Sequence, residues 1–416
     1  MSSKITALAL GCCLTLGGLT ISLSPTAAYA QQKDAKALNI KVGTPLKAAL
    51  DALKNKQYDT ALAKVKEAEA EKKTAYEQFK INETLAAIYY GQKKYAELAG
   101  VYEKMLETPQ FLGEQSPVNA KAVAQMYAAA QQRSLDNKVI EYSKRWLQDK
   151  PNDGDVLALL GQTYYSVKEY KACKDTMLTA ISNIEKNGGK PAANALDMAR
   201  SCSDSMGDAT TAAQILEKLC RYYPEPKYWQ PYIRSQSRGA SDLASFHWSR
   251  LMNDVGVLKD HDDFSNYAQQ AMLQYGSPSE GLRVVDEGFK KNILGADAKL
   301  KVRDQKLMDN AKAAAQAEKS GRAQLEAEAD KDPTGEKNVA VGMSYFGDNQ
   351  YDQAISELEK GLKKGGLKEP GNAKLTLGVA QLKKHQVDAA RATFKSLTND
   401  PQLGKVAAAW ILRSYN

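Results

Sequence analysis

A self-similar pattern with a period of about 34 residues constrains this chain more than any other feature of its sequence. Its clearest copy spans residues 154–187 and holds two apolar series: Leu157, Leu160, Gly161 and Tyr164, then Tyr170, Cys173, Met177 and Ala180. Spacings of three, four and seven residues place each series on one face of a helix. The unit is therefore expected to be a hairpin of two amphipathic helices that turns near Val167 and Lys168.

Further copies of the pattern lie on both sides of this unit. The corresponding residues are Met126, Val139, Trp146 and Pro151 upstream, and Gly342, Tyr345, Tyr351 and Ala354, then Gly378, Ala390 and Phe394, downstream. They resemble the tetratricopeptide repeat (TPR), whose signature combines Leu-Gly, an aromatic, a small residue and a final proline. The glycines would let paired helices pack closely. The resemblance implies an all-α fold, a right-handed TPR-like solenoid of stacked antiparallel helical hairpins.

The strength of the pattern divides the chain into segments. Residues 31–44 are expected to be an N-terminal linker, and residues 45–294 a solenoid of about six to seven hairpins. Its last part, residues 225–294, is degenerate because Pro231 and Pro278 fall where the pattern expects other residues. Residues 295–333 are predicted to form a charged helical spacer that splits the solenoid. Residues 334–416 are predicted to form two further hairpins and a capping helix, since terminal repeats need a cap.

The first thirty residues indicate export. Lys4 gives a positive start, residues 5–21 are mostly apolar, and Ala28-Tyr29-Ala30 forms a small-x-small cleavage site. We therefore expect a signal peptide at residues 1–30, cleavage before Gln31 and a periplasmic protein with no membrane span after cleavage. A retained anchor would need about 20 strongly apolar residues, more than this stretch offers. Lipidation at Cys12 is the other alternative.

Little in the sequence indicates catalysis. There are three histidines, and no His-Glu-x-x-His, phosphate-binding loop or Gly-x-Ser-x-Gly pattern occurs. A metal site at His261, Asp262 and Asp263 is an alternative, but acidic residues there also suit the positive end of a helix dipole. The net charge of +8 is spread over interleaved acidic and basic residues, unlike a nucleic-acid-binding stripe. We predict no enzyme activity, no cofactor, no metal and no nucleic-acid partner.

The predicted mature chain holds three cysteines, Cys173, Cys202 and Cys220. Cys173 and Cys202 are almost equally far from the turn between their helices, so antiparallel packing can bring them to the same height in a disulfide. Cys202 and Cys220 fail this test, because their offset along the helices would be roughly 12 Å. Buried reduced thiols that act as small hydrophobic residues are the alternative.

A partner is expected on the inner surface of the solenoid. Residues one step beyond the packed face are rotated by about 100° and should line that surface. This rule selects Tyr90, Gln131, Gln162, Tyr165, Asn194, Asp197, Trp229 and Gln236. Amides beside exposed aromatics suit an extended internal segment of another envelope protein, although an exposed polar face needs no partner. The functional hypothesis is a periplasmic scaffold for assembling an envelope complex. The alternative is an accessory module that binds peptidoglycan or exopolysaccharide for a separate enzyme.

Overall fold

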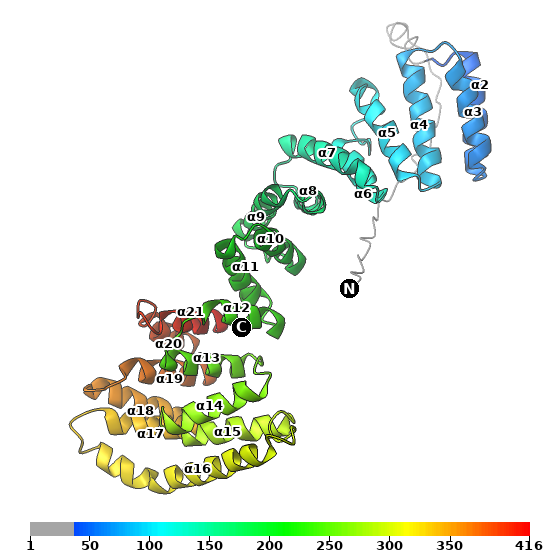
Figure 1. The fold of residues 1–416 in the computed structure, drawn as a ribbon. Helices are drawn as coiled ribbons and strands as arrows, with labels where there is room; N and C mark the ends of the chain where they lie inside the picture. Colours follow the sequence, from blue (N-terminus) through cyan, green and yellow to red (C-terminus); the bar gives the residue numbers. More distant parts are fainter. Residues whose placement is uncertain (1–36) are drawn as a thin grey trace. The chain divides into compact units, whose positions relative to one another are not determined.

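The computed structural model describes residues 37–416, and the predicted signal peptide lies outside this range. All regular elements in the described range are helical, with no β-strand, which confirms the all-α prediction. The chain divides into two compact units at Tyr142 and Ser143 (Figure 1). None of the helices described here is long and apolar enough to cross a membrane.

The first unit is built from paired helices. They are α2 (Ile40–Lys54), α3 (Tyr58–Ala70), α4 (Ala75–Gly91), α5 (Tyr95–Leu106) and α6 (Ala120–Ala129), and the boundary between the units falls within α7 (Asp136–Asp149). Helix α2 packs on α3, and α4 packs on both α3 and α5. Each helix thus contacts its neighbours in the sequence, as expected of stacked hairpins.

The second unit continues the array and also contains one much longer helix. Its first helices are α8 (Gly154–Ser166), α9 (Tyr170–Lys186), α10 (Ala193–Ser205), α11 (Ala209–Tyr222), α12 (Pro226–Gln236), α13 (Asp242–Asp254), α14 (His261–Leu273) and α15 (Pro278–Lys290). The remaining helices are α16 (Lys301–Ala329), α17 (Glu336–Gly347), α18 (Tyr351–Lys364), α19 (Pro370–Lys383), α20 (Val387–Lys395) and α21 (Gly404–Arg413). Consecutive pairs again form hairpins, among them α8 with α9 and α17 with α18. The described chain therefore has a TPR-like fold.

Glycines mark the closest approach of the two helices within a hairpin. A Cβ added to Gly161 would overlap Met177 of the partner helix α9. Gly342 faces Leu358 in the same way, and Gly378 faces Phe394. The prediction that these small residues permit close packing is confirmed.

The turns inside the hairpins repeat one backbone motif. Lys168 has a φ of 65°, its N–H donates to the carbonyl of Tyr165 (3.1 Å), and the N–H of Glu169 donates to Tyr164 (2.9 Å). This pair of bonds is the Schellman motif, which satisfies carbonyls at a helix C-terminus. The same pattern, with a positive φ, recurs at Lys56, Lys93, Gly207, Asn349 and His385. In each case the second helix begins two residues later, so this turn fixes the register of the hairpin.

The predicted linker at residues 31–44 is wrong from Ile40 onward, where α2 begins. The side chain of Asn39 accepts a hydrogen bond from the N–H of Lys41 (2.9 Å) and so caps the helix. The backbone N–H of Asn39 in turn donates to Glu77 of α4 (2.6 Å). The cap and this tertiary bond start the helix earlier than the apolar pattern indicates.

The predicted spacer is a single helix, α16, but it does not split the array. Helix α16 packs against both α15 and α17, and these two helices also contact each other directly. Nε of Arg283 on α15 donates to the carbonyl of Gly347 at the end of α17 (2.7 Å). Most charged residues of α16 are exposed, but Asp304 and Arg322 are buried and bond to His261 and Asp348, so the helix covers a continuous stack.

At the C-terminal end, α17 to α20 form two hairpins, and the single helix α21 follows them and also packs against earlier helices of the same unit. Trp410 of α21 is 1% exposed, and its ring stacks on Phe394 with centroids 6.0 Å apart. Helix α21 contacts α11 and α13, and Nε of Arg413 donates to Asp254 of α13 (2.7 Å). Figure 1 shows α13 beside the helices at the C-terminal end. The last helix, α21, thus packs back against α13, which lies much earlier in the chain.

Candidate protein-binding face and buried polar centre

Helix α8 has the two faces that the sequence predicts. Leu157, Leu160, Gly161 and Tyr164 are buried, whereas Ala158, Gln162 and Tyr165 are exposed. Tyr165 leaves 37% of its surface exposed, and one edge of its ring meets Tyr170 of α9 at a centroid distance of 5.6 Å. The tyrosine is therefore supported from one side and open on the other.

Helix α10 contacts α8 and also carries exposed polar residues. Asn194 is exposed, and the side chain of Asp197 is 39% exposed. One carboxylate oxygen of Asp197 accepts a hydrogen bond from Tyr228 of α12 (3.0 Å), and the other lies 3.8 Å from Arg200. These contacts hold the carboxylate in place while part of it faces solvent. We call the set Gln162, Tyr165, Asn194 and Asp197 the α8–α10 face.

Two residues selected for the inner surface prove to lie elsewhere. Trp229 is fully buried, because the packed face of α12 includes Tyr228, Trp229, Tyr232 and Ile233, a register different from that of α8. Gln131 is exposed but lies in a turn with a φ of 55°, since α6 already ends at Ala129. The prediction of a helical inner-face position is wrong for both.

The last two selected residues are accessible to different extents. Gln236 closes α12, is half-buried, and donates to Ser235 (3.4 Å). Tyr90 belongs to the first unit and is 43% exposed near the end of α4. Tyr90 therefore meets the predicted exposure within its own unit.

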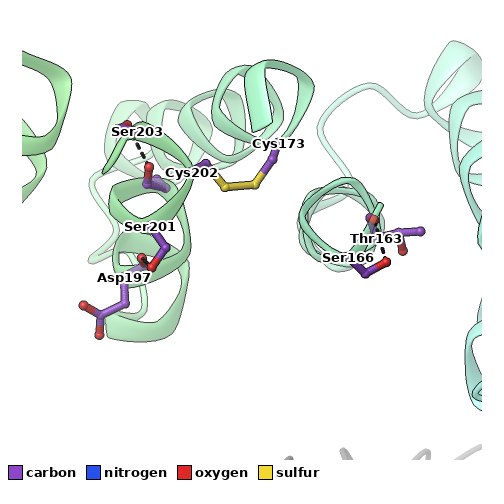
Figure 2. Close-up of a disulfide and its surroundings, with 8 residues drawn as sticks. Thr163, Ser166, Cys173, Asp197, Ser201, Cys202 and Ser203 are labelled. Carbon is purple, nitrogen blue, oxygen red and sulfur yellow. Dashed lines mark hydrogen bonds between the residues drawn. A yellow bond between two sulfur atoms is a disulfide. The ribbon is translucent and has the colours of Figure 1, made fainter. Parts of the chain in front are cut away.

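A disulfide joins α9 and α10. It links Cys173 and Cys202, whose Cα atoms are 6.1 Å apart, across 29 positions of sequence. Figure 2 shows that the carboxylate of Asp197 points away from this bond. Cys220 is a buried free thiol, and burial raises its pKa above the ordinary range. The bond connects the second helix of one hairpin to the first helix of the next.

A buried polar centre, which the sequence analysis missed, lies where α13, α15 and α19 meet. Arg250 and Glu280 are 3% and 1% exposed and form two parallel hydrogen bonds, Nε to Oε1 (2.7 Å) and Nη2 to Oε2 (2.6 Å). Tyr267 donates to the same carboxylate (2.6 Å), and Arg250 also donates to Thr376 of α19 (2.6 Å). His247 pairs with Asn372 of α19 at 3.1 Å. Polar contacts thus join helices far apart in the sequence.

Electrostatics within this centre favour one charge state for each group. Burial alone raises the pKa of Glu280, but the charge and hydrogen bonds of Arg250 outweigh it and hold the pKa below the usual range. Burial, together with the charge of Arg250, lowers the pKa of His247 well below its usual value. Glu280 is therefore ionised and His247 neutral near pH 7, which makes the centre a fixed ion pair with neutral neighbours.

His261 participates in a structural contact and not in a metal cluster. It begins α14, and its Nε2 lies 2.7 Å from Asp304 of α16, whose other oxygen accepts from the N–H of Gly295 (2.8 Å). The hydrogen bond to Asp304 raises the pKa of His261. Across residues 37–416, no group of three or more His, Cys, Asp or Glu side chains is arranged to hold a metal ion.

The solved structures compared with this chain share little sequence identity with it. No protein-family model matches the sequence, and no curated protein matches it either. Similar solved structures include a tetratricopeptide repeat protein from Parabacteroides merdae, with 10% identity and a TM-score of 0.31 over 91% of this chain and 100% of that one. Naa15/Naa10 bound to HypK-THB gives 11% and 0.30 over 92% and 66%, and yeast Tom70 gives 11% and 0.23 over 90% and 95%. At these TM-scores the likenesses indicate nothing about a partner.

Proposed function

We propose that this chain is an exported bacterial scaffold of the periplasm, and that its α8–α10 face holds an internal segment of another envelope protein. The observation that carries the proposal is the partly exposed ring of Tyr165 beside the exposed amide of Gln162. Both lie on a helix whose opposite face is packed. Tyrosine offers a large contact area at low entropic cost, and amides bond to the backbone of an extended chain.

Two features support an oxidising compartment for this role. The first is the leader at residues 1–30, with its cleavage site before Gln31. The second is the Cys173–Cys202 disulfide, since such bonds persist in exported proteins and are rare in the cytosol. Export is tested by N-terminal sequencing of the protein recovered from the envelope, which should begin at Gln31. An intact N-terminus in the cytosolic fraction would contradict it.

A photoreactive amino acid at Gln162 tests the binding face in intact cells. Illumination should give an adduct of discrete mass with one envelope protein, because Gln162 faces the proposed partner. The matched control places the same group at Lys171 of α9, whose side chain is 79% exposed. Equal adducts at both positions, or none at Gln162, would exclude this face.

Alanine substitution then measures the contribution of the aromatic ring. Tyr165→Ala should reduce the Gln162 adduct, and it should leave the helical signal nearly unchanged because the ring is partly exposed. Met206→Ala in the α10–α11 turn removes a side chain of comparable exposure (41%) and should have no effect. Retention of the purified protein on sacculi or exopolysaccharide, without a protein adduct, would instead favour an accessory module that binds cell-envelope carbohydrate.

A further inference from the structure

A small cavity opens beside the buried polar centre, where the C-terminal helices close onto α13. Its volume is about 70 Å³, and its lining comes from α13, α14, α15, α17, α18, α19 and α21. The lining residues that matter here are Asn253, Arg283, Lys383 and Trp410. The cavity therefore lies where the C-terminal helices pack against α13, a contact that we call the closed joint.

Two polar atoms of the lining residues are buried without a hydrogen-bond partner among the described residues. They are Nε1 of Trp410, a residue that is 1% exposed, and Oδ1 of Asn253. An indole N–H can only donate, and an amide oxygen can only accept. Buried polar groups in folded proteins are almost always hydrogen-bonded. A guest that accepts from Trp410 and donates to Asn253 would satisfy both atoms.

The charges around the cavity are unbalanced. Arg250 and Glu280, which both line it, neutralise each other. Asp254 accepts from both Lys383 and Arg413, and Arg283 donates to the carbonyl of Gly347 (2.7 Å). Among the lining residues outside the neutral pair, two cations (Lys383 and Arg283) therefore stand against one carboxylate (Asp254), an excess of one positive charge. Positive charge that is partly withdrawn from water favours an anion nearby.

We propose that this cavity binds one small oxyanion that also carries a hydroxyl group, such as a hydroxycarboxylate or hydrogen phosphate. The anion accepts hydrogen bonds from Trp410 and Arg283, and its hydroxyl donates to Asn253. A water molecule occupies about 30 Å³ in the liquid, so the volume of about 70 Å³ equals that of about two water molecules and suits a small anion. The bound anion links α13, α15 and α21 and stabilises the closed joint. This site is separate from the α8–α10 face and does not depend on it.

Titration calorimetry of the full mature chain tests the site with two probes, inorganic phosphate and glycolate. Chloride at equal ionic strength controls for general screening, and acetate controls for the missing hydroxyl. One of the two probes should bind saturably with a stoichiometry of one, and acetate should bind more weakly than glycolate. Phosphate and glycolate share the required chemistry, and their relative affinities identify which anion the cavity prefers.

Trp410→Phe removes the indole donor and keeps an aromatic ring against Phe394. Affinity should fall about ten-fold or more, as expected for a lost hydrogen bond to a charged group. Trp229→Phe is the matched control, because Trp229 is also fully buried with an unpartnered Nε1 but does not line the cavity. It should leave the affinity unchanged.

Arg283→Gln provides a second variant if Trp410→Phe fails to fold, since Arg283 is only half-buried. It should weaken binding to a similar degree while circular dichroism remains that of the parent protein. Equal binding by the parent, Arg283→Gln and any folded Trp410→Phe variant would overturn the proposal. The proposal would also be overturned if phosphate and glycolate raised the melting temperature no more than chloride does. The cavity would then hold only ordered water.

Discussion

Removal of the Cys173–Cys202 disulfide should destabilise the α8–α11 region measurably. The bond closes a loop across 29 positions of sequence, and the chain-entropy relation for such a loop gives about 3.6 kcal/mol at 25 °C. Native disulfides typically contribute about 2–4 kcal/mol. The double substitution Cys173→Ala and Cys202→Ala avoids an unpaired thiol and should lower the free energy of unfolding by an amount in this range.

The assay is urea denaturation of the parent and the double variant, each with and without reductant. Reduction should bring the parent close to the variant and should not affect the variant, whose remaining thiol, Cys220, is unpaired. Hydrogen exchange should place the loss in α9 and α10, because hairpins in a stacked array depend mainly on their neighbours. The reasoning would be refuted if reductant left the parent unchanged, or if all three thiols of the unreduced, denatured protein reacted with an alkylating agent.

Three further predictions follow from other contacts. Glu280→Gln leaves the buried charge of Arg250 unpaired and should lower stability by about 3–5 kcal/mol, whereas combining it with Arg250→Met should restore much of that loss in a double-mutant cycle. Because the pKa of His261 is raised in the folded state, its contribution should be complete below the unfolded value of about 6.5 and should decline as pH rises through the folded value. The stability difference between the parent and His261→Ala should therefore be larger at pH 5.5 than at pH 8.5; the opposite trend would contradict the bond to Asp304. Lys168→Gly relieves a φ of 65° and should raise the melting temperature through a gain of about 0.5–1 kcal/mol; an unchanged or lower melting temperature would contradict it.

The sequence predicts those parts of the fold that depend on neighbouring residues. The hairpin period, the close approach at Gly161 and the exposed face of α8 all follow from spacings within one unit. The sequence does not reveal the Schellman turns because Lys168 and all but one of its equivalents, Gly207, are not glycines, although a Tyr two residues later marks several of them. Local patterns thus indicate the hairpin but not its turn geometry.

The inner-face prediction is wrong where the packing register of one hairpin does not hold in another. The rotation rule that is correct for Gln162 is wrong for Trp229, because Trp229 itself belongs to the packed face of α12, together with Tyr228, Tyr232 and Ile233. Gln131 was misplaced because α6 is a short helix. A degenerate repeat keeps its helical period while its register changes, so the apolar period alone cannot assign the inner surface there.

The buried polar centre could not be predicted from any local pattern. Arg250 pairs with Glu280 across 30 positions and with Thr376 across 126. One signal was available in the sequence, since Arg250 follows Phe246 by four residues and so lies on an apolar helix face. A charged residue on such a face indicates a buried partner, but the partner's identity depends on how the chain closes.

This closure divides the second unit into regions that respond differently to perturbation. Around the α8–α10 face, the contacts join adjacent hairpins, including the Cys173–Cys202 bond, so a change there should remain local. Between α13 and α19, the pairs Arg250–Thr376 and His247–Asn372 cross more than a hundred positions, so loss of one contact should loosen helices at both ends of the closed joint. A partner held by Tyr165 and Gln162 would then meet a surface whose flexibility is set by neighbouring hairpins, while the proposed anion would act on the stability of the C-terminal joint. Binding at the two sites should accordingly be independent, since coupling requires a shared element with two arrangements.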